Sequence, residues 1–212
     1  MSLADMRRNY RAASLADTDL PDDPLELFHD WLAAAEAAGE PEPNAMALAT
    51  VSPDGQPRVR YVLLKYVQDG GFVFFTNYAS LKGLDLAATP RAALVFWWPQ
   101  LERQIRIEGT VERLSEAASD AYFSERPRGS QLGAWSSQQS APVRDRNELS
   151  DAQAANEAKF AGQPVPRPAG WGGYLVSPER IEFWQGREDR LHDRFEYSRV
   201  AGSGWRVRRL AP

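Results

Sequence analysis

The sequence predicts one α+β domain built on a mainly antiparallel, barrel-like β-sheet with peripheral helices. Short segments of strand-like composition follow one another through short turns such as Ser52-Pro53-Asp54-Gly55 and Asp69-Gly70-Gly71, which is typical of antiparallel sheets. A regular alternation of strands and long helices, the mark of a parallel sheet, is not seen. At 212 residues with 43% hydrophobic content, the chain is large enough for one well-packed domain.

The first half of the chain is expected to hold an arm, a helix and most of the barrel. We assign residues 1–20 to an N-terminal arm and residues 21–212 to the domain. Apolar residues recur at helical spacing between Pro24 and Gly39, with proline at the start and glycine at the end, which predicts a helix. Strands are then expected over 45–51, 58–67 and 72–76, a short helix over 80–88, and strands over 92–97 and 103–114.

The second half is expected to begin with helices and to end with strands. Helices are predicted over 115–126, 131–135 and 146–161, followed by a loop over 163–170 that contains three prolines. The final strands are predicted over 173–185, 191–198 and 205–210.

Composition excludes several classes of function. A net charge of −4 and a pI near 5.3 argue against a protein whose main partner is nucleic acid. The chain has no cysteine and only two histidines, His29 and His192, so neither a thiolate nor a histidine-based zinc site is expected. No apolar run approaches the roughly 20 residues of a membrane helix. With no secretory signal at the N-terminus, a cytoplasmic location is expected, and redox chemistry would require an organic cofactor.

Three cationic positions in the first half are candidates for binding anions. Arg60 and Lys65 interrupt a segment otherwise suited to burial, and in a regular strand they would point to opposite faces. Lys82 follows a strand at the start of a helix, where free N–H groups and the helix dipole favour anions. The alternatives are strand-end cations that reach solvent through their aliphatic stems and a plainly capped helix with an exposed lysine.

Two further sets of polar residues could line a ligand site. Gln104 lies on the polar side of an alternating strand, where its amide could bond the edge of a flavin if that face lines a pocket. Tyr122 and Arg126 are four residues apart on one helix face, and Ser130 follows in the next turn, which suits a phosphate. A solvated strand face and a common helical pair are the alternatives.

The C-terminal segment is the most informative one. In a strand after a turn, Arg190, His192 and Arg194 would share one face. Such a row of basic groups repels itself unless something anionic or electron-rich faces it. This pattern therefore favours a binding function over a solvated strand face.

The segments 182–186 (Glu-Phe-Trp-Gln-Gly) and 190–194 (Arg-Leu-His-Asp-Arg) resemble the C-terminal signature of the pyridoxine/pyridoxamine 5′-phosphate oxidase family. Further motifs of that family occur in its order and spacing, among them Arg60…Lys65, Phe75-Thr76, Glu102-Arg103-Gln104, the run from Tyr122 to Trp135, Gln139-Ser140 and the ending 209–212. The similarity covers nearly the whole chain from about Asp19 onward.

The resemblance implies a split β-barrel that forms a homodimer, with FMN in the cleft between the subunits. It implies that FMN is bound by Arg60, Tyr61, Val62, Leu63, Leu64, Lys65, Phe75, Thr76, Lys82, Gln104, Gln139, Ser140, Trp184 and Arg194. The substrate would be bound by Lys65, Tyr122, Arg126, Ser130, Arg190, His192, Arg7 and Tyr10. Arg190 and His192 would face the pyridine ring opposite the flavin and act as the catalytic pair.

The implied reaction is the oxidation of pyridoxamine or pyridoxine 5′-phosphate by O₂ to pyridoxal 5′-phosphate, with release of hydrogen peroxide. One position departs from the family, whose members commonly carry arginine where this chain has Leu81. The loss of that cation predicts FMN binding weaker by about tenfold or more. Phe75 in place of the more usual tyrosine matters less if that position contacts FMN through its backbone.

Two rival functions stay open at the level of sequence. One is a different split-barrel flavoenzyme, for instance a reductase of another substrate. The other is a non-catalytic carrier of flavin or pyridoxal phosphate.

Overall fold

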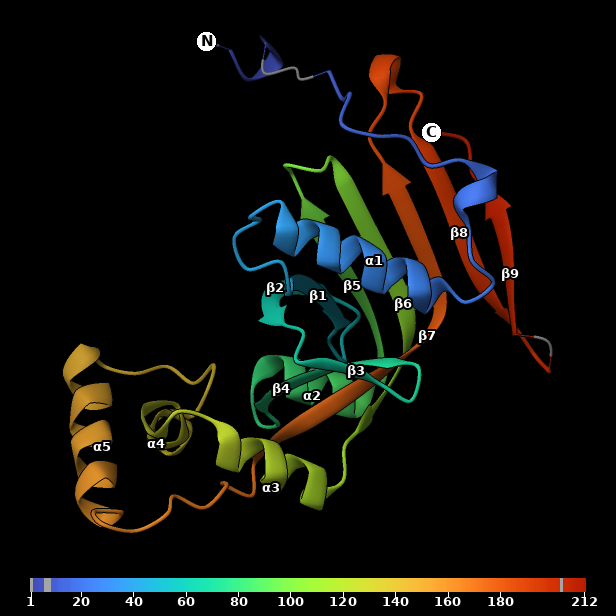
Figure 1. Ribbon diagram of the computed structural model, residues 1–212. Helices are drawn as coiled ribbons and strands as arrows, with labels where there is room; N and C mark the ends of the chain where they lie inside the picture. Colours follow the sequence, from blue (N-terminus) through green and yellow to red (C-terminus); the bar gives the residue numbers. More distant parts are fainter. Residues whose placement is uncertain (1, 6–8, 203) are drawn as a thin grey trace.

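A single nine-stranded antiparallel sheet forms the framework of the computed structural model, which describes residues 2–5, 9–202 and 204–212 (Figure 1). Its main path runs β2-β1-β5-β6-β7-β4-β3, with β8 and β9 added beside β7. The strands are β1 (Ala45–Val51), β2 (Pro57–Leu63), β3 (Tyr66–Gln68), β4 (Gly71–Asn77), β5 (Arg91–Trp98), β6 (Arg103–Arg113), β7 (Trp171–Gln185), β8 (Asp193–Val200) and β9 (Gly204–Arg209).

The long strand β7 makes the sheet divide. Its first part, from Trp171 to Val176, pairs with β4, whereas its last part, from Arg180 to Gln185, pairs with β8. A register shift between Glu108 and Gly109 marks the point where β6 changes its course along β7. The sheet therefore curls as a split barrel, and the predicted α+β fold with a mainly antiparallel sheet is confirmed.

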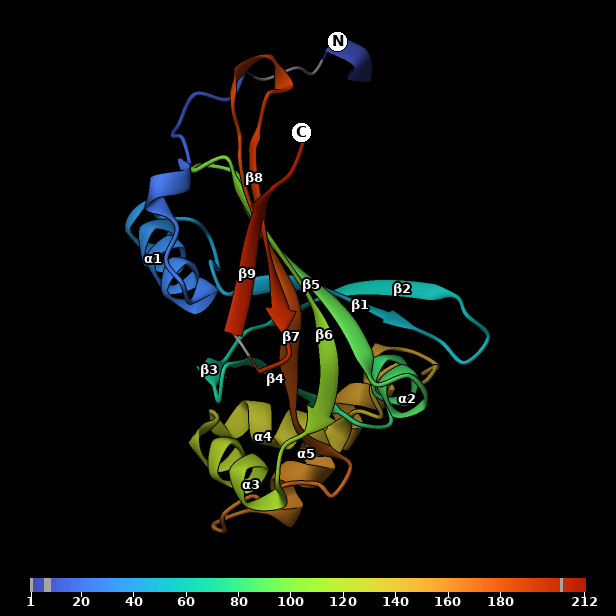
Figure 2. The same cartoon turned by 90° about the vertical axis from the view of Figure 1, so that its right-hand side faces the viewer.

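Helix α1 (Pro24–Ala37) covers the main hydrophobic core on one side of the sheet (Figure 2). Pro24 occupies the first helical position, as the sequence predicts, and Asp23 caps the first turn. Phe28 packs edge-on against Phe72 and Phe96, and Trp31 packs against Phe183. These rings are almost entirely buried, so α1 is fixed to the sheet by aromatic contacts.

Four further α-helices follow α1 along the described chain. They are α2 (Leu81–Ala88), α3 (Glu116–Glu125), α4 (Arg128–Ser136) and α5 (Arg146–Lys159). Figures 1 and 2 show α3, α4 and α5 grouped at the end of the molecule opposite the two termini. Phe123, Leu132 and Phe160 join Trp171 of β7 in a separate hydrophobic cluster there. No helix of the described ranges is long and apolar enough to span a lipid bilayer.

Two strand boundaries differ from the sequence prediction. The expected strand over 58–67 is two strands, because the chain changes partner at Leu64 and Lys65. The Leu64 N–H donates to Asn44 O beside β1, and the next N–H, that of Lys65, donates to Val73 O of β4. The expected strand over 191–198 begins only at Asp193, because Asp189 and Arg190 adopt positive φ angles of 55° and 62° in a short 3₁₀ turn.

Candidate active site

A cavity of about 1340 Å³ lies between β2, β4, the start of α2 and the segment from α3 to residue 140. It brings together most of the residues predicted from the first two-thirds of the chain. These are Arg60, Tyr61, Val62, Leu63, Lys65, Phe75, Thr76, Lys82, Tyr122, Arg126, Ser130, Gln139 and Ser140. Leu64, from the same stretch as Arg60 and Lys65, does not line it, because its side chain is buried in the main core.

Arg60 and Lys65 both line this cavity, and the prediction that they point to opposite faces of one strand does not apply to them. That prediction assumed one regular strand through both residues. The change of partner at Leu64 and Lys65 ends the alternation of side chains between them.

Lys82 is a buried residue at the helix end of the cavity. Its Nζ donates to Thr76 Oγ1 and Ser80 Oγ, each at 3.1 Å. Burial, reinforced by the nearby Arg60 guanidinium, lowers the pKa of Lys82 to about 8. Thr76 Oγ1 in turn donates to Gln139 Oε1 at 2.9 Å, so this part of the cavity is a connected set of polar groups.

Tyr122 and Arg126 form a second polar group in the same cavity. Tyr122 stacks on Phe75 with 3.9 Å between ring centroids, and Arg126 lies 4.6 Å from the centroid of Trp171. Burial raises the pKa of Tyr122, so its phenol keeps its proton. Arg126 Nη1 is buried and has no hydrogen-bond partner, the single such side-chain atom among the described residues. A buried donor of this kind fits an anionic ligand.

Helix geometry differs slightly from the prediction for this group. Arg126 is the C-cap of α3, in an extended conformation, and not a residue of its last turn. Ser130 lies in the first turn of α4, with its N–H bonded to Pro127 O. Both residues still line the cavity with Tyr122.

The predicted residues of the C-terminal strands form a separate row. Gln104, Trp184 and Arg194 are direct neighbours in register across β6, β7 and β8. Within the described part of the chain, the lining of the large cavity includes none of these three. The structure of one chain therefore divides the predicted FMN-binding residues into two groups.

His192 lies beside this row, and Arg190 precedes it by two residues in the chain. The His192 ring lies 4.5 Å from the Trp184 ring and 5.9 Å from that of Tyr10. Its Nδ1 accepts a hydrogen bond from the Arg187 N–H at 3.1 Å. Burial, with the positive charge of Arg190 added, lowers the pKa of His192 below its ordinary value, so the ring is neutral at pH 7.

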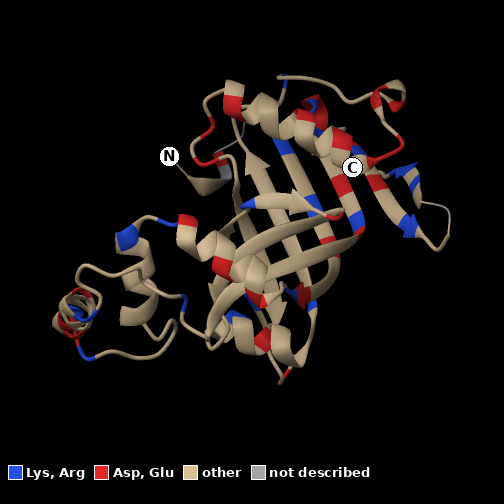
Figure 3. Ribbon diagram, turned by 60° about the horizontal axis from the view of Figure 1, so that its bottom comes forward, with Lys and Arg blue, Asp and Glu red and all other residues tan. Residues whose placement is uncertain are grey.

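The predicted row of uncompensated cations is wrong in part. Arg190 stands in the 3₁₀ turn and not on β8. Arg194 Nε donates to the buried carboxylate of Glu182 at 2.8 Å, which also accepts from Arg106 at 3.0 Å. Farther along, Glu196 of β8 pairs with Arg208 of β9, and Figure 3 shows acidic and basic residues together on the strands near the C-terminus. Of the two arm residues, Tyr10 packs edge-on against Trp184, whereas Arg7 lies outside the described residues.

Sequence reasoning missed three charged residues around these groups. Arg58 lines the cavity beside Arg60, and Asp85 is a buried carboxylate that accepts a hydrogen bond from Arg58 at 2.9 Å. Glu182 was noticed only as part of a motif. Arg58 could have been found from its spacing of two residues from Arg60 on a strand, whereas the acids have partners too distant in sequence to be found.

The fold defines the class of protein first. A pyridoxamine 5′-phosphate oxidase-related, FMN-binding protein from Nostoc punctiforme has the same split-barrel fold, with a TM-score of 0.70 over 87% of this chain and 97% of the other at 19% identity. PhzG from Burkholderia lata, solved with tetrahydrophenazine-1-carboxylic acid, matches with a TM-score of 0.87 over 93% of this chain and 98% of the other at 34% identity.

Sequence comparison is more specific. Residues 32–155 match the family model of pyridoxamine 5′-phosphate oxidase, and residues 171–212 match that of the pyridoxine 5′-phosphate oxidase C-terminal dimerisation region. Pyridoxine/pyridoxamine 5′-phosphate oxidases from Rubrobacter xylanophilus and Thermosynechococcus vestitus are 57% and 58% identical, each over 99% of this chain and over 96% and 99% of their own. The chain belongs to the pyridoxamine 5′-phosphate oxidase family. The family, oxidase class and FMN cofactor predicted from the sequence are confirmed.

Proposed function

We propose that this protein oxidises pyridoxamine and pyridoxine 5′-phosphate to pyridoxal 5′-phosphate, with O₂ as the final electron acceptor. Pyridoxine phosphate and O₂ give the aldehyde and hydrogen peroxide, and the amine substrate additionally takes up water and releases ammonia. The observation that carries the proposal is the presence of two cationic groups in one cavity, Arg60 with Lys82 and Lys65 with Arg126. Two such groups suit a phosphorylated cofactor and a phosphorylated substrate bound side by side.

The first group fits the phosphate of FMN. Among the described residues, Lys82 Nζ donates hydrogen bonds to two hydroxyl groups. An ammonium group has three N–H donors, so the third can bind a ligand. The flavin, when bound, supplies the two-electron acceptor that amino-acid side chains lack.

The second group would hold the substrate by its phosphate. Arg126 offers its unpaired Nη1, and Tyr122 keeps its phenolic proton as a donor because burial raises its pKa. Lys65 adds a positive charge and Ser130 a hydroxyl at the same cavity. Fixing the phosphate orients the rest of the molecule, an effect that can contribute several kcal/mol to catalysis.

Arg190 and His192 would bind the substrate ring from the other side. The Arg187 N–H donates to Nδ1 of His192, so the neutral imidazole carries its proton on Nε2 and can donate from there. The positive charge of Arg190 also lowers the pKa of His192. We assign them the orientation of the pyridine ring and its 4′ substituent.

Among the described residues the cavity lining includes neither Arg190 nor His192, and we propose that two copies complete each other's sites. Val59 and Tyr61 are 70% and 76% exposed on β2, and Trp97 is 43% exposed on β5, all apolar and on the same face of the sheet. Gln104 and Trp184 continue that face. Burial of these side chains against a second copy would stabilise a symmetric dimer. The match to a dimerisation region over residues 171–212 supports this arrangement.

The cytoplasmic location stays a prediction.

The decisive experiment is an anaerobic titration of the FMN-loaded protein with pyridoxamine 5′-phosphate. We expect the flavin absorbance near its visible maximum to bleach in a saturable way, and hydrogen peroxide to appear on admission of air. Pyridoxamine without phosphate is the matched control and should bind far more weakly, because it leaves Arg126 unpaired. Bleaching by reduced nicotinamide cofactors but not by the phosphates would instead indicate a reductase, and no bleaching at all a carrier.

The pKa of Lys82 predicts how FMN affinity depends on pH. Below about pH 8 the amine is charged and attracts the phosphate; above it, FMN binding must drive uptake of a proton. The affinity of the apoprotein for FMN should therefore fall as pH rises from 7 to 9, with up to about tenfold loss per pH unit above 8. Fluorescence titrations measure this, and Lys82→Met should remove the dependence. An unchanged slope in Lys82→Met would assign the effect to another group.

A further inference from the structure

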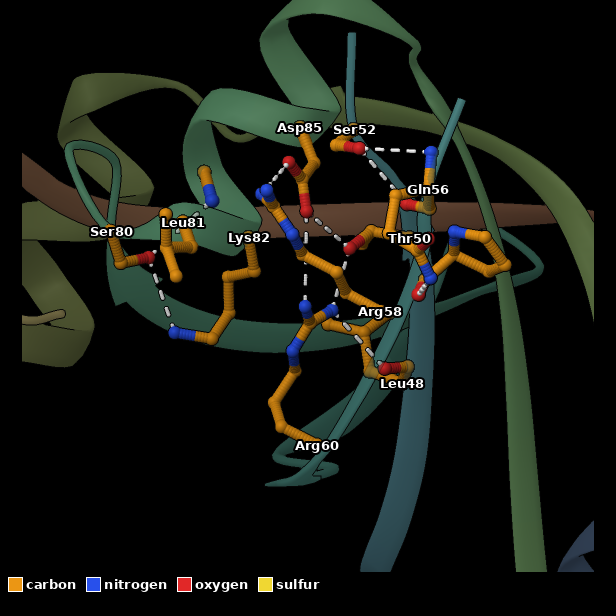
Figure 4. Close-up of polar contacts among 12 residues, drawn as sticks. Leu48, Thr50, Ser52, Gln56, Arg58, Arg60, Ser80, Leu81, Lys82 and Asp85 are labelled. Carbon is orange, nitrogen blue, oxygen red and sulfur yellow. Dashed lines mark hydrogen bonds and ion pairs between the residues drawn. The ribbon is translucent and has the colours of Figure 1, made fainter. Parts of the chain in front are cut away.

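Arg58 and Arg60 direct two guanidinium groups to the same side of β2. Alternate residues of a strand share a face, and these two are half-buried whereas Val59 and Tyr61 are largely exposed. Both arginines line the large cavity. Figure 4 shows them meeting at the first turns of α2, where Lys82 also lies.

Asp85 holds the two arginines in this position. Its carboxylate is completely buried and accepts from Arg58 Nη1 at 2.9 Å and from Thr50 Oγ1 at 2.7 Å. Arg60 Nη2 lies 3.8 Å from the same carboxylate, and Arg60 Nη1 donates to Thr50 Oγ1 at 2.6 Å. One buried acid from α2 thus fixes two basic side chains from β2, as Figure 4 shows.

The charges of this cluster do not cancel. Arg58, Arg60 and Lys82 supply three positive charges and Asp85 one negative charge, which leaves an excess of two at pH 7. A phosphate monoester carries about −1.5 to −2 at that pH. The cluster is therefore matched in charge to one phosphate monoester only if Arg58 is counted.

We propose that Arg58 is a ligand of the FMN phosphate in this chain, and that Asp85 is the positioning residue for Arg58 and Arg60. This assignment rests on the proposed function, because it takes FMN as the cofactor. It also accounts for Leu81, the first residue of α2, whose apolar side chain is 47% exposed at the same cavity. A cation that the helix does not provide at residue 81 is provided by the facing strand at residue 58.

The test compares FMN with riboflavin, which lacks the phosphate, by fluorescence titration of the full-length apoprotein. Arg58→Gln should weaken FMN binding by about tenfold or more and leave riboflavin binding within about twofold. Arg58→Gln/Asp85→Asn avoids an unpaired buried carboxylate and should show the same selective loss. Adding Leu81→Arg to this double variant should restore most of the FMN affinity. Arg91→Gln, at an exposed arginine paired with Glu179, is the matched control.

The outcomes separate the assignment from the function on which it rests. Wild-type FMN affinity in the Arg58→Gln/Asp85→Asn variant would show that Arg58 only neutralises Asp85, and would overturn the assignment alone. Equal weakening of FMN and riboflavin would also overturn it, since the phosphate would then not be the group contacted. A wild-type chain that binds neither flavin would overturn both the assignment and the proposed function.

Discussion

Replacement of Arg190 by alanine is expected to lower kcat on the order of a hundredfold while FMN affinity changes by less than about twofold. Arg190 is exposed in the isolated chain and lies in a 3₁₀ turn, with its positive charge near His192. Its proposed partner is the substrate ring, whereas the phosphate of FMN is assigned to residues of the cavity. The loss should therefore fall on turnover and not on flavin retention.

Steady-state kinetics and an FMN titration of the same preparation measure the two effects. Arg199→Ala is the matched control, because Arg199 is an exposed arginine of β8 whose guanidinium lies over the Trp205 ring. Turnover of Arg190→Ala equal to that of Arg199→Ala would remove Arg190 from the catalytic machinery. Loss of FMN in parallel with turnover would make it a cofactor ligand instead.

Local sequence signals were sufficient wherever the structure is set by neighbouring residues. Helix α1 was predicted because Pro24 begins it, Gly39 follows its end and apolar residues recur at helical spacing between them. β1 was predicted with its bounds from composition and the following turn. The break between β2 and β3 was not, because it depends on the chain changing partners from β1 to β4, and no residue near Leu64 signals that exchange.

The same limit applies to the site. Arg60, Lys82, Tyr122 and Arg126 were predicted as anion-binding residues, and the cavity brings all four together. Asp85 was missed because its partner Arg58 is 27 residues away. Arg190 was placed on a strand because strand propensity does not reveal a positive φ in a non-glycine residue. The sequence therefore reveals the motifs but not the contacts between residues that are far apart in the chain.

Two inactive variants of this protein are expected to restore activity when they share a dimer. The variants are Arg126→Ala, which alters the cavity, and Arg190→Ala, which alters the turn before β8. If each site joins the cavity of one subunit to the turn of the other, a mixed dimer has one site with both defects and one with none. With random pairing half of the dimers are mixed, so co-expression should give about a quarter of wild-type activity.

The matched control pairs two cavity variants, Arg126→Ala and Lys65→Ala. Both defects then belong to the same half of the site, so every site of a mixed dimer carries one defect and activity should stay at the level of the single variants. Affinity tags of two kinds allow the mixed dimers to be isolated and their FMN content compared. Without rescue in the Arg126/Arg190 pair, despite isolated mixed dimers that hold FMN, each chain would have to build its site alone. Because the cavity lining of the described chain includes neither Trp184 nor His192, that result would require β8 and its preceding turn to move toward the cavity within one subunit.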